Sequence, residues 1–209
     1  MINLGSKTIE TDRLILKAQT MDEQYYLWSL LMLPEVNKYC VITPKDQIHT
    51  KKEYIEKIKD WSKQEPLFKE FIKIANEPYI YYWSIFLKET GECIGRISCQ
   101  SFFEEGYNGF DPTVRDVGWF IDPKHMRKGY GTEAASAMIE YMFLECDIEC
   151  LITFVAVDNP ASWKIMKKIG FKEIGKTKSE YTFLDEPVDV YQLFLTKKMY
   201  LEKNNEKTR

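Results

Sequence analysis

The stretch HMRKGYGTEA, residues 125–134, has the composition of an anion-binding turn. Two basic residues, Arg127 and Lys128, precede Gly129 and Gly131, and helix-forming residues follow. Glycine permits close backbone approach and unusual dihedral angles. The first turn of a helix offers unpaired N–H donors and a partial positive charge. Together these features predict a bound anion, and a phosphate group fits such a site.

The glycine stretch does not match two common nucleotide-binding patterns. A Walker A loop requires Gly-Lys followed by Ser or Thr, and that sequence is missing. The dinucleotide fingerprint requires a third glycine where Ala134 stands. A bare Gly-x-Gly is a weak signal, and a structural turn without a ligand would also explain it.

Composition limits the functional classes. The formal net charge of the 209 residues is −3, which argues against a protein that mainly binds nucleic acid and mildly favours a cationic substrate. No signal peptide or membrane-spanning run is visible, so we expect a cytoplasmic protein. The five cysteines form no C-x-x-C pair and are expected to be free thiols. The two histidines lie far apart and show no metal-ligand spacing, so no metal is expected.

The elements around the turn are predicted from periodicity and capping signals. Strands are expected at 13–17, 79–88, 92–103, 114–122, 151–157, 172–183 and 188–200. Helices are expected after the capping boxes at 20–23 and 50–53, across 66–78, from about 131 to 146, and at 158–171. Residues 114–157 then read as strand, helix, strand, which predicts a right-handed crossover between parallel strands. Residues 1–200 are expected to form one domain, with 201–209 as a solvated, frayed tail.

From Arg13 onward the sequence resembles the GCN5-related N-acetyltransferases, abbreviated GNAT, and especially their RimJ/RimL-type branch. The resemblance is carried by ETDRLIL near the start, VGWFIDPKHMRKGYGTEA in the middle and VDNPASWKIMKKIGFKEIG near the end. It implies an α+β fold, often filed as α/β. Such a fold has a central, twisted, mostly antiparallel sheet of about seven strands, splayed between parallel strands 4 and 5, with helices on both faces.

The resemblance also identifies the anion as the pyrophosphate of acetyl-coenzyme A (acetyl-CoA). The family's loop pattern is Gln/Arg-x-x-Gly-x-Gly/Ala, and Met126 departs from it at the first position. The implied cofactor-binding loop comprises Met126, Arg127, Lys128, Gly129, Tyr130, Gly131 and Thr132. The backbone N–H groups of residues 127–132 would be the donors. The pantetheine arm would pair with the strand around Trp119, Phe120 and Ile121 and would contact Asn159. Arg127 and Lys128 could equally be a solvated basic pair.

The implied reaction is direct attack of an amine on the thioester, which needs a base, oxyanion donors and an acid for the thiolate. Ser162 is the candidate acid, unless it merely helps to satisfy the helix start capped by Asn159. Glu180 is the candidate base, because burial beside Tyr181 and Phe183 would raise its pKa. The alternative for Glu180 is an exposed carboxylate on a strand. Glu104, Glu105 and Asp116 are substitutes if water relays the proton.

The expected function is therefore an acetyl-CoA-dependent N-acetyltransferase acting on a protein N-terminus or a small amine, as a monomer or homodimer. No nucleic acid or membrane is expected as a partner. The alternative is a non-catalytic module that binds acyl-CoA. A buried Glu180 facing a pocket would favour the enzyme, whereas a solvent-facing Glu180 with no substitute carboxylate would favour the module. An RNA-associated protein is disfavoured by the acidic balance.

Overall fold

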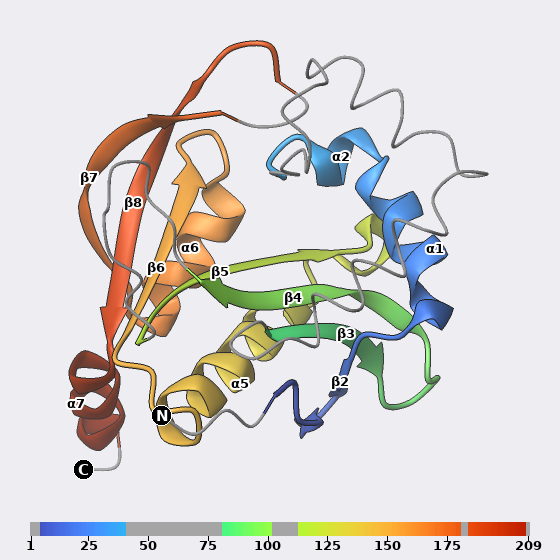
Figure 1. Cartoon of the computed structure of the whole chain (residues 1–209), viewed down its shortest axis with the longest axis horizontal. Helices are drawn as coiled ribbons and strands as arrows, with labels where there is room; N and C mark the ends of the chain where they lie inside the picture. The colour runs from blue at the N-terminus through green and yellow to red at the C-terminus, as the bar shows by residue number, and fades with distance from the viewer. Residues whose placement is uncertain (1–4, 41–80, 102–112, 181–183, 208–209) are drawn as a thin grey trace.

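The fold is a single twisted sheet with helices packed on it (Figure 1). The computed structural model describes residues 5–40, 81–101, 113–180 and 184–207. Within these residues the sheet has eight strands in the order β1-β2-β3-β4-β5-β6-β8-β7. The strands are β1 (Ile9–Glu10), β2 (Leu14–Ala18), β3 (Tyr81–Leu87), β4 (Cys93–Ser101), β5 (Val114–Ile121), β6 (Cys150–Ala156), β7 (Lys172–Ser179) and β8 (Val188–Thr196). The family resemblance led us to expect about seven strands, and the short β1 at the sheet edge accounts for the difference.

Helices occupy both faces of this sheet. They are α1 (Met21–Leu31), α2 (Pro34–Asn37), α5 (Tyr130–Leu144), α6 (Pro160–Ile169) and α7 (Lys197–Lys207), with a 3₁₀ turn at Pro123–His125. The large core lies between α5 and the sheet, where Met138, Ile139 and Met142 are fully buried. On the opposite face, Leu27, Leu30 and Leu31 of α1 pack with Phe120 of β5. The predicted α+β class and two-sided covering are confirmed.

The only parallel pair in the described sheet is β5 with β6, and it is short. The two strands are paired from Val114 to Asp116 on β5 and from Cys150 to Ile152 on β6. Beyond these residues the strands diverge, as Figure 1 shows at the centre of the molecule. The hydroxyl of Thr153 still reaches the Val117 carbonyl at 3.0 Å. The predicted splay is therefore present, and it leaves one edge of β5 open in this part of the chain.

Local sequence signals fix the ends of the helices. Thr20 and Glu23 form the predicted capping box at the start of α1. Asn159 caps α6 by accepting a hydrogen bond from the Ser162 amide, and Pro160 occupies its first turn. Gly170 ends α6 as its C-cap, with φ of 127°. The cap at Asn159 starts α6 soon after β6 ends at Ala156, so the start of this helix lies beside the splayed strands.

The carboxyl-terminal residues differ from expectation. The last strand ends at Thr196 instead of continuing to 200, and residues 197–207 form α7 rather than a frayed tail. Tyr200 explains part of this, because its ring packs against Phe143 of α5 with centroids 5.3 Å apart. The expected helices at 50–78 lie outside the described residues.

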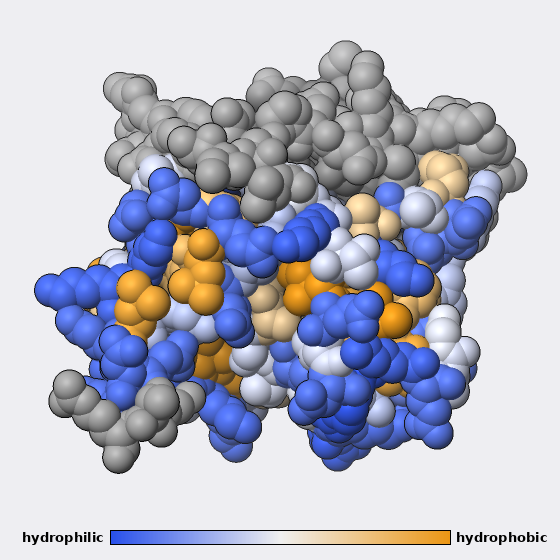
Figure 2. Space-filling view, turned by 90° about the horizontal axis from the view of Figure 1, so that it is seen from below, coloured by the Kyte–Doolittle hydropathy of each residue, from blue (hydrophilic) through white to orange (hydrophobic). Residues whose placement is uncertain are grey.

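The surface of the α5 and α7 side is mainly hydrophilic. Figure 2 shows hydrophobic residues there in separate patches on the described part of the face.

All five cysteines are free, as expected. Among the described residues no helix combines the length and apolar character needed to cross a membrane.

Candidate active site

The glycine stretch forms a turn that leads from β5 into α5. Arg127 has φ of 61° and Gly129 has φ of 86°, so two left-handed residues reverse the chain before the helix begins at Tyr130. Such a conformation suits glycine and is strained for other residues. The βαβ context predicted for this turn is present, because β5 precedes it and β6 follows α5.

The turn presents a row of free backbone donors. The Met126 amide donates to the Pro123 carbonyl at 3.3 Å, and the Glu133 amide donates to the Gly129 carbonyl at 3.1 Å. Between them, the amides from Arg127 to Thr132 donate to no other group in the described parts of the chain. Unpaired donors at a helix start, aided by the helix dipole, favour an anion.

The two glycines of the turn have different structural roles. A Cβ on Gly129 would lie 3.2 Å from the Arg13 Nη2 atom and would also strain the backbone. A Cβ on Gly131 would lie 3.4 Å from the Trp119 Nε1 atom and 3.6 Å from Ile165 Cδ1. Gly129 therefore shapes the turn, while Gly131 lets α5 approach β5 and α6 closely. The structure thus brings the loop, β5 and α6 together.

The other predicted loop residues lie at the surface. Met126, Arg127 and Lys128 are exposed, and Tyr130 and Thr132 are half-buried. Exposed basic side chains beside the free amides add positive charge where an anion would bind. Met126 stands outside the row of free amides, because its own amide is bonded to Pro123.

On β5, the residues predicted to flank the pantetheine arm lie along the open edge of the splay. Phe120 and Ile121 are buried, and Trp119 is half-buried. All three are paired with β4 on one side, whereas the pairing with β6 ends at Asp116. The opposite edge is thus available for backbone hydrogen bonding to a ligand.

At the start of α6, the predicted capping role of Asn159 is confirmed. Its Oδ1 atom accepts the Ser162 amide at 3.2 Å. This contact uses the backbone of Ser162, so the hydroxyl takes no part in the cap. The half-buried Ser162 hydroxyl makes no hydrogen bond to the described residues, which leaves it able to donate to a bound group.

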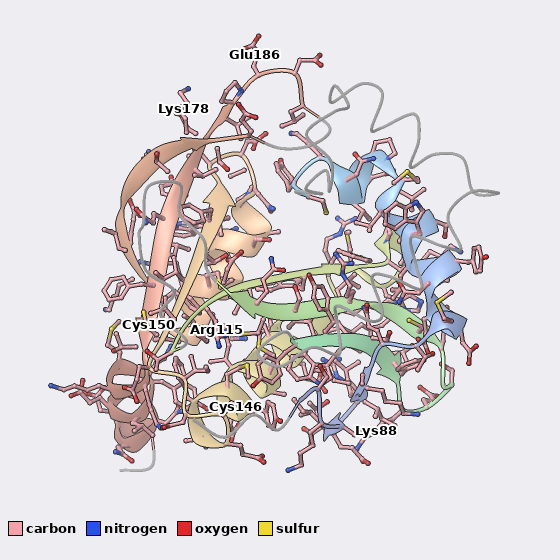
Figure 3. All side chains as sticks on the ribbon, viewed as in Figure 1. Lys88, Arg115, Cys146, Cys150, Lys178 and Glu186 are labelled. Carbon is pink, nitrogen blue, oxygen red and sulfur yellow. The ribbon has the colours of Figure 1, made fainter. Side chains whose placement is uncertain are left out.

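The burial expected for Glu180 is not found. Glu180 follows the end of β7 and is exposed. Lys178 and Glu186, labelled in Figure 3, mark the same end of the β7–β8 hairpin. The strand was predicted to continue to 183, but it ends at Ser179, and Tyr181 and Phe183 lie outside the described residues. The carboxylate therefore lacks the burial that the sequence led us to expect.

Asp116 is half-buried, in contrast to the exposed Glu180. It lies at the last residue of β5 that pairs with β6, where the splay begins. Burial raises the pKa of Asp116 to about 7, although the Val117 amide and the Gln100 side chain favour the charged form. Figure 3 labels the preceding residue, Arg115, where β5 and β6 meet. A carboxylate with a pKa near neutrality can accept a proton at physiological pH.

Hydrogen bonds across three strands fix the surroundings of Asp116. Gln100 lies opposite Asp116 on β4, and its Oε1 atom accepts the Tyr82 hydroxyl of β3 at 2.7 Å. The chain Tyr82–Gln100–Asp116 therefore crosses the sheet towards the splay. Glu104 and Glu105, the other proposed substitutes, lie outside the described residues.

Beside Asp116, at Gly118, the described sheet surface carries no side chain, and we call this position the hollow. Asp116, Gly118 and Phe120 alternate along β5 and so share the face covered by α1. Gly118 is exposed, and a Cβ there would meet only Ser98 Oγ at 4.0 Å among the described atoms. Among the described residues, no β5 side chain separates the Asp116 carboxylate from Phe120 on this face, next to the open edge of β5.

His125 lies in a small polar cluster at the beginning of the turn. Ligand atoms of Glu92, Asp122 and His125 are within 4.8 Å of one another. The Tyr26 hydroxyl donates to Asp122 at 2.5 Å, and Asp122 also accepts the Lys124 amide at 3.0 Å. Sequence spacing gave no sign of this cluster, because Glu92 is separated from His125 by 33 positions in the chain. The contacts link α1 to the turn.

Two functional features were missed or undervalued in the sequence. Asp116 was considered only as a substitute, although a carboxylate within the otherwise mainly apolar strand VRDVGWFI was a usable signal. Arg13 was noted only as part of a resemblance, yet its guanidinium donates to the Lys128 carbonyl at 3.0 Å. No local pattern connects residues that far apart in the chain.

Comparison with known proteins identifies the family of this chain. Residues 13–172 match the sequence profile of the family described as "Acetyltransferase (GNAT) domain". The chain is 26% identical over 196 residues to an uncharacterized N-acetyltransferase, p20, of Bacillus licheniformis, covering 93% of this chain and 98% of the relative. It is 25% identical over 167 residues to the uncharacterized N-acetyltransferase YoaA of Bacillus subtilis, covering 80% and 84%.

Solved structures share the fold. A GNAT acetyltransferase from Bacillus anthracis superposes with a TM-score of 0.67 at 21% identity, covering 92% of this chain and 99% of the other. A spermidine N-acetyltransferase from Vibrio cholerae, solved with CoA and spermine, gives a TM-score of 0.68 at 17% identity, covering 91% and 99%. With the family match over most of its length, this chain belongs to the GNAT acetyltransferase family and is an acetyltransferase enzyme.

Proposed function

We propose that this enzyme uses acetyl-CoA to acetylate a primary amine, and that the amine attacks the thioester directly. The observation that carries the proposal is the turn before α5. Its amides from Arg127 to Thr132 have no partner in the described chain, and they lie beside the open edge of β5. A cofactor with an anionic group would match the free amides, and an extended arm on that cofactor would match the open edge of β5.

The residues present fit such a group. A side chain on Gly129 would enter the turn and meet Arg13, so the small residue keeps the cradle open. Arg127 and Lys128 add charge at its rim. The pyrophosphate would be held by the amides of 127–132, and the pantetheine arm by the edge of Trp119–Ile121 and by Asn159. Bound acetyl-CoA would supply the acetyl group as a reactive thioester.

Asp116 is proposed as the group that accepts the amine proton. A protonated amine cannot attack, so the acceptor must lose a proton near neutral pH. Burial sets the pKa of Asp116 at about 7, which matches this task. Because Asp116 provides a substitute carboxylate, the exposure of Glu180 does not favour a non-catalytic module. Glu180 remains a second candidate, to be tested beside Asp116.

Two further groups are proposed to stabilise the charges that develop. N–H groups on the open edge of β5, around Trp119, can donate to the developing oxyanion. The Ser162 hydroxyl, which has no partner among the described residues, can donate its hydrogen to the departing thiolate. The first group belongs to strand β5 and the second to helix α6, so backbone hydrogen bonding positions both.

The acceptor is proposed to be a protein N-terminus or a small amine. Both are cationic in solution, and the protein has a formal net charge of −3, which mildly favours their approach. One structural neighbour is a spermidine N-acetyltransferase and another is a putative ribosomal-protein-serine acetyltransferase, both from Vibrio cholerae. A panel of polyamines and peptides with free N-termini would distinguish the two acceptor classes.

The test is calorimetric titration with acetyl-CoA. We expect the wild-type protein to bind and Gly129→Trp to lose binding, because the indole would fill the cradle. Gly91→Trp is the matched control: Gly91 also has a positive φ, 70°, but nothing lies within 4 Å of its Cβ position. Equal binding by wild type and Gly129→Trp would contradict the loop assignment. Absence of binding by wild type would contradict the use of acetyl-CoA.

A further inference from the structure

Arg13 connects the amino-terminal segment to the phosphate-binding turn. Its Nη1 atom donates to the Lys128 carbonyl at 3.0 Å. Its Nε atom donates to Glu133 at 2.8 Å, and its Nη2 atom forms an ion pair with the same carboxylate at 2.6 Å. The guanidinium also lies 4.6 Å from the centre of the Tyr130 ring. One side chain thus contacts the turn, the first residue of α5 and the first turn of that helix.

Glu133 receives an unusually complete set of donors. Besides the guanidinium, the Thr11 hydroxyl donates to it at 2.6 Å and the Arg13 backbone amide at 2.9 Å. Burial opposes ionisation of Glu133, but the bonds from Thr11 and Arg13 outweigh it and lower the pKa. The carboxylate is therefore ionised at neutral pH. Its charge is held in a fixed place at the start of α5.

We propose that Arg13 and Glu133 form a brace that keeps the turn in the shape that binds the pyrophosphate of acetyl-CoA. The inference rests on the proposed function. Arg13 is a positioning residue here, because it acts through the backbone of the turn rather than on the reacting atoms. Thr11 also belongs to the brace, because its hydroxyl donates to Glu133. The brace acts on the peptide unit between Lys128 and Gly129.

The geometry of the peptide bond explains the effect. In a trans peptide the C=O and N–H groups point in opposite directions, and no peptide bond in the described chain is cis. The bond from Arg13 to the Lys128 carbonyl therefore fixes the direction of the Gly129 amide, which belongs to the proposed cradle. Without this bond the peptide can rotate, since Gly129 is conformationally free. A rotated peptide would direct a carbonyl oxygen towards the anion.

The charge of Glu133 gives a second reason why loss of Arg13 should weaken the binding of a phosphate. A carboxylate in the first turn of a helix stabilises the helix, but it repels a phosphate bound at the same end. Arg13 neutralises Glu133 at this point, and it leaves the free amides and the basic rim to set the local potential. Loss of Arg13 would expose the anion to an uncompensated carboxylate. Both effects weaken the binding of phosphates rather than the folding of the chain.

The fold should tolerate loss of the brace. The Arg13 side chain is 49% exposed, and ion pairs at such positions contribute little to stability. Glu133 would retain its bonds from Thr11 and from the Arg13 backbone after the side chain is removed. Arg13→Ala is therefore a suitable test variant. Arg13→Lys keeps the charge but lacks the planar guanidinium fork that bonds Lys128 and Glu133 in a fixed geometry, so it should fall between wild type and Arg13→Ala.

The experiment compares two acetyl donors. Acetyl-CoA carries the pyrophosphate, whereas acetyl-pantetheine lacks it. For Arg13→Ala we expect Kd and KM for acetyl-CoA to rise about tenfold, the effect of one charge-assisted hydrogen bond. We expect kcat/KM for acetyl-pantetheine to stay at the wild-type value. Lys88→Ala is the matched control, because Lys88 pairs with Glu10 at 3.0 Å on the same sheet edge (Figure 3).

Each outcome decides between the proposals. If wild type binds acetyl-CoA and Arg13→Ala binds it equally well, the brace is wrong while the proposed function stands. If Arg13→Ala weakens both donors equally, its role is general to the fold and the brace is again wrong. If wild type does not bind acetyl-CoA, the proposed function itself fails. A selective loss for acetyl-CoA, partly restored in Arg13→Lys and absent in Lys88→Ala, supports the brace.

Discussion

Replacing Asp116 with asparagine should abolish most of the activity while stabilising the protein at alkaline pH. Asparagine has nearly the same shape, so the strand and its neighbours should be preserved. It cannot accept a proton at neutral pH, and general base catalysis typically contributes about 10²- to 10⁴-fold. We therefore expect kcat/KM to fall by about that factor. Binding of acetyl-CoA should change little, because the pyrophosphate cradle is formed by other residues.

The pH dependence of the wild-type enzyme follows from the pKa of about 7. Only the ionised carboxylate can act, so kcat/KM should rise about tenfold for each pH unit below 7 and level off above it. At pH 6 about one tenth of the plateau activity is expected. This acidic limb should disappear in Asp116→Asn.

Stability should depend on pH in the opposite direction. Because the folded-state pKa of Asp116 is raised above its ordinary value of 3.8, the folded state binds more protons than the unfolded state between about pH 4 and 7. The contribution of Asp116 to the free energy of unfolding therefore falls as pH rises through this window. The total loss is at most about 4 kcal/mol. Asp116→Asn should avoid this loss, so its stability advantage over wild type should grow between about pH 4 and 7 and be complete above pH 7.

The assay is thiol release from acetyl-CoA across pH 5 to 9, with urea unfolding at pH 5 and 8. Glu180→Gln is the direct comparison, since Glu180 is the other candidate base, and we expect it to keep the acidic limb. Asp189→Asn is a control for an exposed carboxylate, one that pairs with Lys178 at 3.0 Å. Full activity in Asp116→Asn would refute the reasoning. Loss of the acidic limb in Glu180→Gln instead would identify Glu180 as the base.

Two other substitutions test the remaining parts of the site. Ser162→Ala should lower kcat by about 10²-fold with unchanged affinity for acetyl-CoA, because the cap uses the Ser162 amide and not its hydroxyl. Steady-state kinetics and calorimetry check this, and wild-type kcat would show that the hydroxyl has no catalytic role. Gly118→Val should lower kcat/KM at least tenfold by filling the hollow beside Asp116, while the free energy of unfolding stays within about 0.5 kcal/mol of wild type or rises. Unchanged turnover in a folded Gly118→Val protein would mean that substrates do not occupy the hollow.

Local signals in the sequence predicted an element well where its structure depends only on residues close together in the chain. The Thr20–Glu23 box, the Asn159 cap and the apolar stripe of α5 all specify structure within a few residues, and all are confirmed. The prediction of a frayed tail was wrong, because the exposed polar residues of this segment do not reveal the packing between Tyr200 and Phe143 that stabilises α7. That packing depends on residues far apart in the chain.

The chemistry of the site was harder to predict for the same reason. Asp116 and Glu180 are both carboxylates on or next to strands, and strand periodicity does not distinguish them. The difference arises from the protein around them: Asp116 sits at the splay and is desolvated, whereas Glu180 lies past the end of β7 in solvent. The contact between Arg13 and Lys128 likewise depends on tertiary structure. Glycine positions and caps were readable because they encode backbone shape directly.

The short pairing of β5 with β6 has a consequence for heat resistance. The two halves of the sheet are joined there by only three residue pairs, so the seam is the natural place for the described sheet to open first. A ligand that lies along this seam bonds to both sides only in the folded state, and mass action then raises the melting temperature with ligand concentration. We expect the melting temperature of this enzyme to rise with the concentration of its acetyl donor. In a cell with little acetyl donor, the enzyme would therefore unfold at a lower temperature than in a cell with abundant donor.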